Sequence, residues 1–146
     1  MDAMDNAILQ ALKENARASA SAIGKRVNLS VPAVLERLKK LTDSGMIEGY
    51  TARISRAKMG LSLLAFVSVR VDGTANIQGF RDTVVRFPCV LECHHMAGEY
   101  DYLLKVAVKD TAALEHFLTG QLKTTQGVAG TNTQIVLATM KEEVNA

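Results

Sequence analysis

The sequence lacks the features that mark membrane or secreted proteins. It has no tryptophan, two cysteines and two prolines, and aromatic residues make up only 5% of the chain. No apolar run approaches the roughly 18 residues that a membrane-spanning helix needs, and Met1 is followed by no basic and then apolar leader. We therefore expect a cytoplasmic protein with no membrane partner.

The two cysteines cannot build a disulfide framework by themselves. On one strand, Cys89 and Cys93 would lie about 13 Å apart, which is beyond disulfide reach. With His94 and His95 they form a cluster of metal-ligand types, but on a strand His94 would point away from Cys93 and His95. No CxxC or HxxxH spacing occurs, so we expect no metal site and no cofactor.

The composition is that of a globular protein with an uneven charge. Of the 146 residues, 48% are hydrophobic and 22% are charged. Residues 1–60 hold ten Lys and Arg against six Asp and Glu, whereas residues 61–146 hold seven against nine. The basic character therefore lies in the first part of the chain, where a helical motif is also found.

Residues 19–49 have the pattern of two short amphipathic helices joined by a turn. Ser30 caps the second of these helices, and Pro32 lies in its first turn, where a missing N–H does no harm. Gly45 can end this helix in the left-handed conformation. The layout predicts a helix-turn-helix DNA-binding domain over residues 1–50.

Two helices come before the one that Ser30 caps. The first is expected over about residues 2–13, with Asp2 and Asp5 near its positive end. Ser19 or Ser21 can cap the next.

The segment after the motif changes character twice. Residues 47–54 have strand character, and we interpret them as a wing or linker rather than a core strand, with a hinge strand or linker over residues 51–60. After Gly60, apolar residues alternate with period two over residues 61–71. This change predicts a second domain over residues 61–146.

The second domain alternates strands and helices. After the strand at 61–71, the predicted elements are a helix over 74–87, strands over 89–96 and 101–108, a helix over 111–122 and a strand over 128–140. The order βαββαβ is typical of a ferredoxin-like α+β fold with both helices on one face of an antiparallel sheet. The opposite face would expose Leu64, Phe66 and Leu103, so we expect a homo-oligomer to cover it.

The last helix of a helix-turn-helix enters the major groove by its N-terminal residues. Helical spacing leaves Arg37 outward, and a guanidinium can pair with guanine or bridge phosphates, so Arg37 is the best candidate for a DNA contact. The first turn is poor in hydrogen-bonding side chains, which predicts modest base readout and a large share of recognition from DNA shape. The predicted DNA-binding residues are Ser30, Pro32, Ala33, Glu36, Arg37, Lys40 and Arg53. The alternative is a helical unit that binds only protein, with Arg37 paired to a carboxylate.

Two motifs in this order resemble a known family over nearly the whole chain. The first includes Met1-Asp2-x-Met4-Asp5, Leu29-Ser30-x-x-x-Val34-x-x-Arg37-Leu38 and Gly45-x-Ile47, and the second is Gly98-Glu99-Tyr100-Asp101-Tyr102-Leu103-Leu104. They resemble the Lrp/AsnC (feast/famine) transcriptional regulators. The resemblance implies an N-terminal winged helix-turn-helix, a hinge strand and a C-terminal ferredoxin-like effector (RAM) domain. It also implies homodimers that assemble further, often to octamers.

The resemblance further implies a site for a free amino acid or related metabolite between effector domains of neighbouring dimers. Asp101 would accept hydrogen bonds from the ammonium group, and turn amides around Gly98 would donate to the carboxylate. Gln134 is polar where other members can be apolar or aromatic. The site residues carried over by position are Gly98, Tyr100, Asp101, Thr131, Thr133, Gln134 and Ile135. Alternatively, Gly98 and Asp101 only shape a hairpin.

Two other functions are compatible with the same fold. Some tetrapyrrole-modifying decarboxylases resemble this family, and His94, His95 or Arg70 could serve such chemistry. No nucleophile–base pair, phosphate loop or paired carboxylates are otherwise visible, so we expect no enzyme activity. The other alternative is a ligand-independent DNA-organising protein. The favoured prediction is a sequence-specific regulator that binds double-stranded DNA and a small effector.

Overall fold

The computed structural model describes residues 1–145, and the chain forms two compact units. One unit contains Met1–Arg53 with the last described residues from Glu143, and the other contains Ile54–Glu142. The boundary after Arg53 lies within the linker that the sequence predicts over residues 51–60. Among the described residues, no helix is long and apolar enough to span a bilayer.

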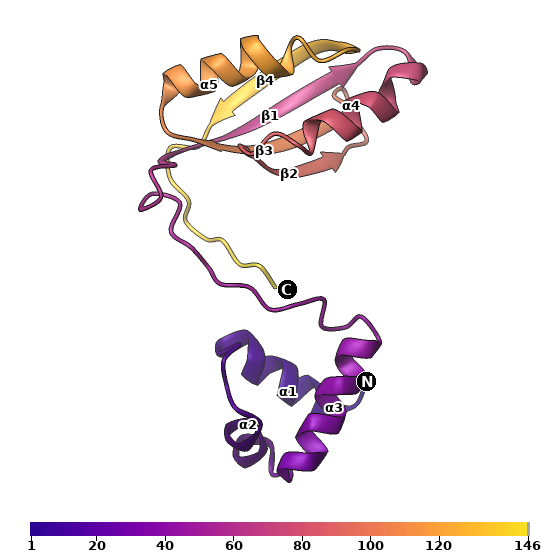
Figure 1. Ribbon diagram of the computed structural model, residues 1–146, viewed down its shortest axis with the longest axis vertical. Coiled ribbons are helices and arrows are strands. Elements are labelled where there is room, and N and C mark those ends of the chain that lie inside the picture. The colour runs from indigo at the N-terminus through magenta and orange to yellow at the C-terminus, as the bar shows by residue number, and fades with distance from the viewer. Residues whose placement is uncertain (146) are drawn as a thin grey trace. The chain divides into compact units, whose positions relative to one another are not determined.

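Three helices form the first unit: α1 (Ala3–Glu14), α2 (Ala20–Val27) and α3 (Val31–Asp43) (Figure 1). Each helix turns one apolar strip toward the other two, because residues three and four apart share a helix face. The buried core residues of this unit are Ile8, Ala11, Ile23, Val27, Val34 and Leu41. The arrangement confirms the predicted helix-turn-helix, which α2 and α3 form.

Side-chain caps begin all three helices. Asp2 caps α1 by accepting the N–H of Asp5 at 2.9 Å. Ser19, and not Ser21, caps α2 by accepting the N–H of Ala22 at 3.1 Å. Ser30 accepts the N–H of Ala33 at 3.4 Å, so the predicted cap of α3 is confirmed.

The turn between α2 and α3 leaves no room for a side chain at Gly24. Asn28 adopts a left-handed φ of 56°, and the N–H of Leu29 donates to the carbonyl of Gly24 at 2.9 Å. A Cβ atom on Gly24 would lie 2.6 Å from the carbonyl oxygen of Leu29, closer than real Cβ atoms approach. Glycine is therefore required where the two helices meet.

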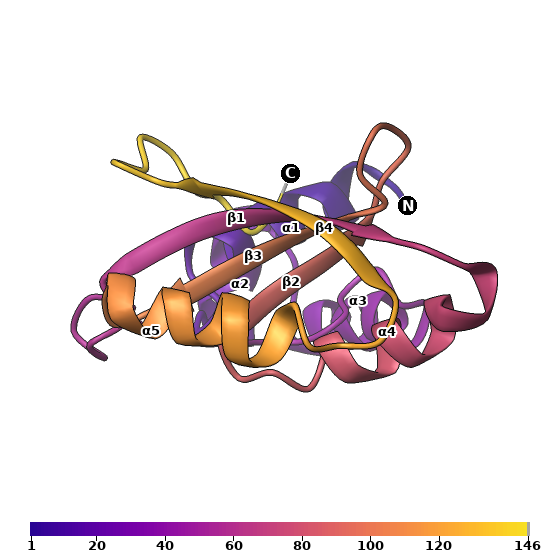
Figure 2. The ribbon, with the colours of Figure 1, turned by 90° about the horizontal axis from the view of Figure 1, so that it is seen from above.

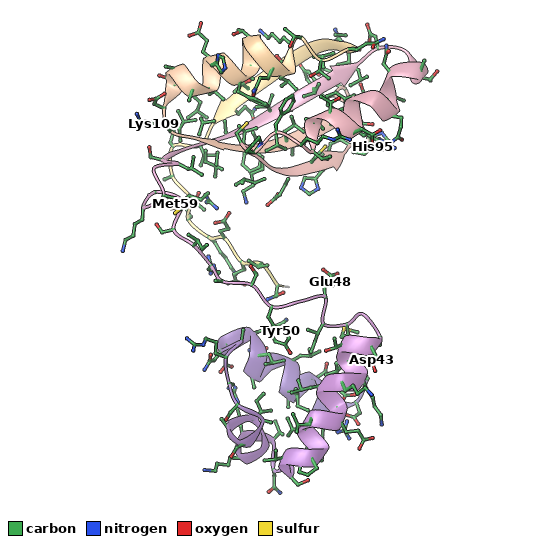
Figure 3. All side chains as sticks on the ribbon, in the orientation of Figure 1. Asp43, Glu48, Tyr50, Met59, His95 and Lys109 are labelled. Carbon is green, nitrogen blue, oxygen red and sulfur yellow. The ribbon has the colours of Figure 1, made fainter. Side chains whose placement is uncertain are left out.

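The chain after α3 contains neither a helix nor a strand up to Arg53. Gly45 has the expected left-handed φ of 76°, and Ile47 packs against the helical core. Figure 3 shows Asp43 in the last turn of α3, and Glu48 and Tyr50 projecting from the segment that follows. Residues 47–54 form no strand in the described chain, which fits the linker interpretation of this segment and not the wing. A strand needs a partner for its backbone groups, and none of the described strands pairs with this segment.

The second unit is a four-stranded antiparallel sheet with two helical segments on one face (Figures 1 and 2). The strand order is β2-β3-β1-β4, which confirms the ferredoxin-like arrangement. The strands are β1 (Leu63–Val71), β2 (Val90–His95), β3 (Tyr102–Val108) and β4 (Val128–Ile135). The helices are η1 (Thr74–Asn76) with α4 (Ile77–Val84), and α5 (Thr111–Phe117) with η2 (Leu118–Leu122).

Several boundaries fall inside the predicted ones. The helix expected over residues 111–122 begins as α5, capped by Asp110, but its last part is the π-helix η2. The strand expected to reach Met140 ends at Ile135. β4 runs antiparallel to β1, which begins at Leu63, so β4 has no partner residues beyond that point. The last hydrogen bond between the two strands is donated by the N–H of Val136 to the carbonyl of Leu64.

The alternation along β1 separates a buried face from an open one. Ala65, Val67 and Val69 are fully buried beneath α4 and α5. Leu64 and Phe66 point to the opposite face and are only half-buried, as is Leu103 of β3. The predicted apolar residues on the uncovered face are therefore found there.

Replacing Gly24 with alanine should destabilise the helical unit. The added Cβ meets a backbone carbonyl that cannot rotate away, and overpacking of this kind costs about 1–3 kcal/mol. Urea unfolding followed by circular dichroism measures the loss. Gly49→Ala is the matched control, because a Cβ there meets nothing within 4 Å. Equal stabilities of the two variants would contradict the steric explanation.

Candidate DNA-binding surface and effector site

The first turn of α3 offers few donors to a DNA phosphate. Pro32 has no N–H, and the N–H of Ala33 is bonded to Ser30. Val31 and Pro32 are exposed, and Ala33 is partly exposed. The tip of this helix therefore presents small apolar groups, which can contact thymine methyls but not read hydrogen-bonding edges.

Glu36 and Lys40 lie one turn apart on the exposed side of α3. Lys40 Nζ is 2.7 Å from Glu36 Oε1, and this ion pair holds the pKa of Glu36 below its ordinary value. Both side chains remain more than half exposed, so the pair is weak and can open when a phosphate approaches. Lys40 is therefore available to a polyanion.

Arg37 does not point to solvent as the sequence suggests. Its Nη1 donates to Asp2 Oδ2 at 2.8 Å and to Asp5 Oδ1 at 2.7 Å, so it connects α3 to the start of α1. The Arg37 side chain is only 30% exposed. Helical spacing alone could not reveal these partners, because they lie more than thirty residues away in sequence.

A second arginine connects α2 to the end of α1. Arg26 donates to both carboxylate oxygens of Glu14, at 2.5 and 2.8 Å. Arg26, together with Gln10, lowers the pKa of Glu14 to about 2. Two basic residues of the helix-turn-helix are thus used inside the unit. Arg53, in the segment after α3, is exposed.

In the second unit, Asp101 fixes the turn between β2 and β3 to the end of β1. Its carboxylate Oδ2 accepts the N–H of Val71 at 2.8 Å, and its N–H donates to the carbonyl of Val69 at 3.0 Å. This turn contains the predicted residues Gly98 and Tyr100. Because a carboxylate has acceptor capacity beyond one bond, Asp101 can also receive an ammonium group.

The predicted residues of β4 divide between the two faces of the sheet. Thr131, Thr133 and Ile135 pair with the buried β1 residues and so share the helix-covered side. Gln134 pairs with Phe66 and lies on the open face. A ligand on one side of the sheet would therefore meet only part of the predicted set.

The turn and the start of β4 approach the same end of β1. Val69 pairs with Tyr102 on one edge and with Thr131 on the other. Two strand spacings place Tyr102 and Thr131 about 10 Å apart, and Asp101 immediately precedes Tyr102.

Arg70 is a basic residue at this end of the sheet that the predicted effector set omits. It pairs with Gly130, and an added Cβ on Gly130 would lie 3.3 Å from Arg70 Nη2. The exposed guanidinium therefore lies over Gly130 on the open face. The sequence could have indicated this position, because the alternation after Gly60 places Arg70 on the face of the strand opposite the buried residues.

A charged network occupies the middle of the open face. Lys105 Nζ lies 2.6 Å from Glu142 Oε1 and 3.0 Å from Glu92 Oε1, and its side chain is only 13% exposed. Glu142 also accepts from Arg56, so the end of the chain returns beside the start of this unit (Figure 1). Lys105 and Arg56 lower the pKa of Glu142 to about 2.

The histidines and cysteines form no metal centre among residues 1–145. Cys89 and Cys93 are free thiols, and burial raises the pKa of both. His94 contacts Glu92 at 3.1 Å, while His95 stacks on Tyr102 with ring centroids 5.1 Å apart. Figure 3 shows His95 at the end of β2. A depression of about 390 Å³ near Phe87 and Gln121 contains none of the predicted effector residues.

Family models match both units of the chain. Residues 1–42 match the AsnC-type helix-turn-helix domain, and residues 64–146 match the Lrp/AsnC ligand binding domain. The protein belongs to the Lrp/AsnC family. It therefore has the two parts of a DNA-binding transcriptional regulator of this family, a helix-turn-helix and a ligand binding domain, on one chain.

Several relatives are similar over nearly their whole length. The transcriptional regulator AzlB of Bacillus subtilis is 32% identical and covers 99% of this chain and 94% of its own. The leucine-responsive regulatory protein of Escherichia coli K12 is 35% identical, over 97% of this chain and 88% of that protein. The structure of a transcriptional regulator from Neisseria meningitidis in complex with L-Met has a TM-score of 0.95. It is 34% identical and covers 99% of this chain and 94% of that one.

Replacing Asp101 with alanine should destabilise the turn between β2 and β3 and lower the free energy of unfolding. The change leaves the N–H of Val71 without its carboxylate acceptor, which costs about 1–3 kcal/mol. Unfolding in urea measures the change. Glu99→Ala, at an exposed position two residues earlier, should cost much less. If both variants were equally stable, Asp101 would not hold the turn.

Proposed function

We propose that this protein regulates transcription in the cytoplasm by binding double-stranded DNA with an affinity that a free amino acid or related metabolite changes. The observation that carries the proposal is the pairing of the two matched domains in one chain. The proposed role is regulatory and not catalytic, because the relatives that match the whole chain are named as transcriptional regulators.

The proposed DNA surface is the exposed side and first turn of α3. Lys40 and Arg53 supply attraction to phosphates, while small apolar groups at the helix tip supply limited base contact. Sequence selectivity then depends on DNA shape and on several helical units bound at fixed spacing. The residues proposed for this surface are Ser30, Pro32, Ala33, Glu36, Lys40 and Arg53.

We propose a homodimer, assembling to an octamer, as the form that holds these units at fixed spacing. Half-buried Leu64, Phe66 and Leu103 on the open face favour burial against a second copy. Multivalent binding by such an assembly strengthens DNA affinity without new contacts per unit.

The proposed effector site lies where the turn before β3 and the start of β4 meet the end of β1. Asp101 accepts from the ammonium group of the effector, and Arg70 pairs with its carboxylate. The solved relative from Neisseria meningitidis, which carries L-Met, makes an amino acid the first class to test. Gln134 on the open face would favour an effector with a polar group. Gly98 and Tyr100 of the turn complete this set, whereas the predicted Thr131, Thr133 and Ile135 lie on the helix-covered side and would meet only a ligand on that side.

DNA affinity should fall as salt rises, and Lys40→Met should make that dependence shallower. Losing one phosphate contact reduces the slope of log affinity against log salt by about one per bound helical unit. Fluorescence anisotropy with a duplex over a salt series measures the slope. Lys123→Met, in the second unit, is the control and should leave it unchanged. An unchanged slope for Lys40→Met would remove Lys40 from the DNA surface.

One or a few of the twenty amino acids should raise the melting temperature. At about a hundred times its dissociation constant, a ligand adds about 2.7 kcal/mol to the stability of the form that binds it. Arg70→Gln should abolish this shift, whereas Arg86→Gln, an exposed arginine elsewhere on the same unit, should keep it. Light scattering with and without the active amino acid reports the assembly. If no amino acid shifted the melting temperature, the effector class would be wrong.

A further inference from the structure

Arg37 is held by two carboxylates that are themselves fixed by the backbone. Asp2 and Asp5 form a capping box at the start of α1: Asp2 Oδ1 accepts the N–H of Asp5, and Asp5 Oδ2 accepts the N–H of Asp2, both at 2.9 Å. Each carboxylate presents its other oxygen to Arg37 Nη1. The backbone therefore already orients both carboxylates, and the aspartate side chains lose little further conformational freedom when they bind Arg37.

The same contacts keep the two acids ionised. The backbone bonds of the capping box, and then Arg37, hold the pKa values of Asp2 and Asp5 below their ordinary values. If Arg37 turned away to meet DNA, two negative charges would remain beside a polyanion. Their repulsion would oppose the contact that Arg37 had made.

Arg37 is placed where it can fix the rotation of α3. It lies four residues after Ala33, so the two share one side of the helix. An anchor at Arg37 therefore sets which side of the first turn faces outward. The separate ion pair between Arg26 and Glu14 ties α2 to the far end of α1, so both helices of the motif are tied to α1.

We propose that Arg37 is a positioning residue, which Asp2 and Asp5 hold so that α3 presents its first turn to DNA at one fixed angle and rotation. The inference rests on the proposed DNA-binding function and refines it. Direct base or phosphate contact by Arg37, as the sequence suggests, is the competing role. The two roles differ in what the aspartates do: they are required for positioning, but they only oppose a direct contact.

The test uses the full chain and a duplex that the unsubstituted protein selects from a random pool. The variants are Arg37→Gln, the pair Asp2→Asn with Asp5→Asn, and all three changes together. Asparagine at position 2 keeps the cap of α1 while removing a carboxylate. Arg17→Gln is the charge control, since Arg17 is an exposed residue of the same unit whose backbone N–H bonds Asn15.

The measured quantity is the ratio of affinities for the selected duplex and a random duplex, over a salt series. Positioning predicts that Arg37→Gln and the double asparagine variant each lower this ratio by about tenfold, as expected for partial loss of base contacts. The triple variant should lower the ratio no further than Arg37→Gln or the double asparagine variant does alone, because each of these already removes the contact between Arg37 and the two aspartates. The salt slope of Arg37→Gln should match that of Arg17→Gln.

Three outcomes would overturn the inference. A direct base contact would lower the ratio for Arg37→Gln but not for the asparagine variant. A phosphate contact would make the salt slope of Arg37→Gln shallower by about one per bound unit. A role limited to stability would leave the ratio unchanged in every variant that is folded at the assay temperature.

Amide hydrogen exchange separates this inference from the proposed function. Without DNA, Arg37→Gln and the asparagine pair should both speed exchange in the first turn of α1 relative to Arg17→Gln, because the link that closes α3 onto it is lost. If the unsubstituted protein selected no duplex, the DNA-binding function would fall, and the positioning role with it. A selective parent protein with unaffected variants would overturn the positioning role alone.

Discussion

The double pairing of β1 organises the second unit. β1 bonds β3 along one edge and β4 along the other, so segments about thirty to seventy residues away in sequence reach its two sides. The fully buried Ala65, Val67 and Val69 hold the helices on one face and leave the other face open. As a result, the turn that Asp101 closes and the start of β4 lie at one end of the sheet. The ligand binding domain thus depends on the register of a single strand.

Local rules predicted most of the fold. The caps at Ser19 and Ser30, the left-handed Gly45 and the alternation along β1 each depend on residues within one turn or one strand. The errors occurred where structure depends on a distant partner. Residues 47–54 have strand character but no strand partner among the described residues, and β4 ends where β1 offers no further partner residues.

The sequence yielded a list of candidate site residues but no geometry for them. The family resemblance named Asp101 and Gln134, but only the register shows that Gln134 and Thr133 lie on opposite faces of the sheet. Helical spacing placed Arg37 on an outward flank, and could not show that two carboxylates at the start of α1 reach it. Charge counting likewise indicated a basic unit without showing that Arg26 and Arg37 are already paired. Long-range electrostatics is the part of the site that sequence patterns do not encode.

The capping box places a structural element at the second residue of the chain. The Asp2 carboxylate accepts from the N–H of Asp5 and from the guanidinium of Arg37, and the N–H of Asp2 donates to Asp5, so the three residues form one small cluster. An affinity tag fused directly to Met1 would bring its own charges and bulk to that cluster. A polyhistidine or basic leader there would compete with Arg37 for the same carboxylates. Removing such a tag, or moving it away from this end, therefore belongs to the design of any measurement of how this protein binds DNA.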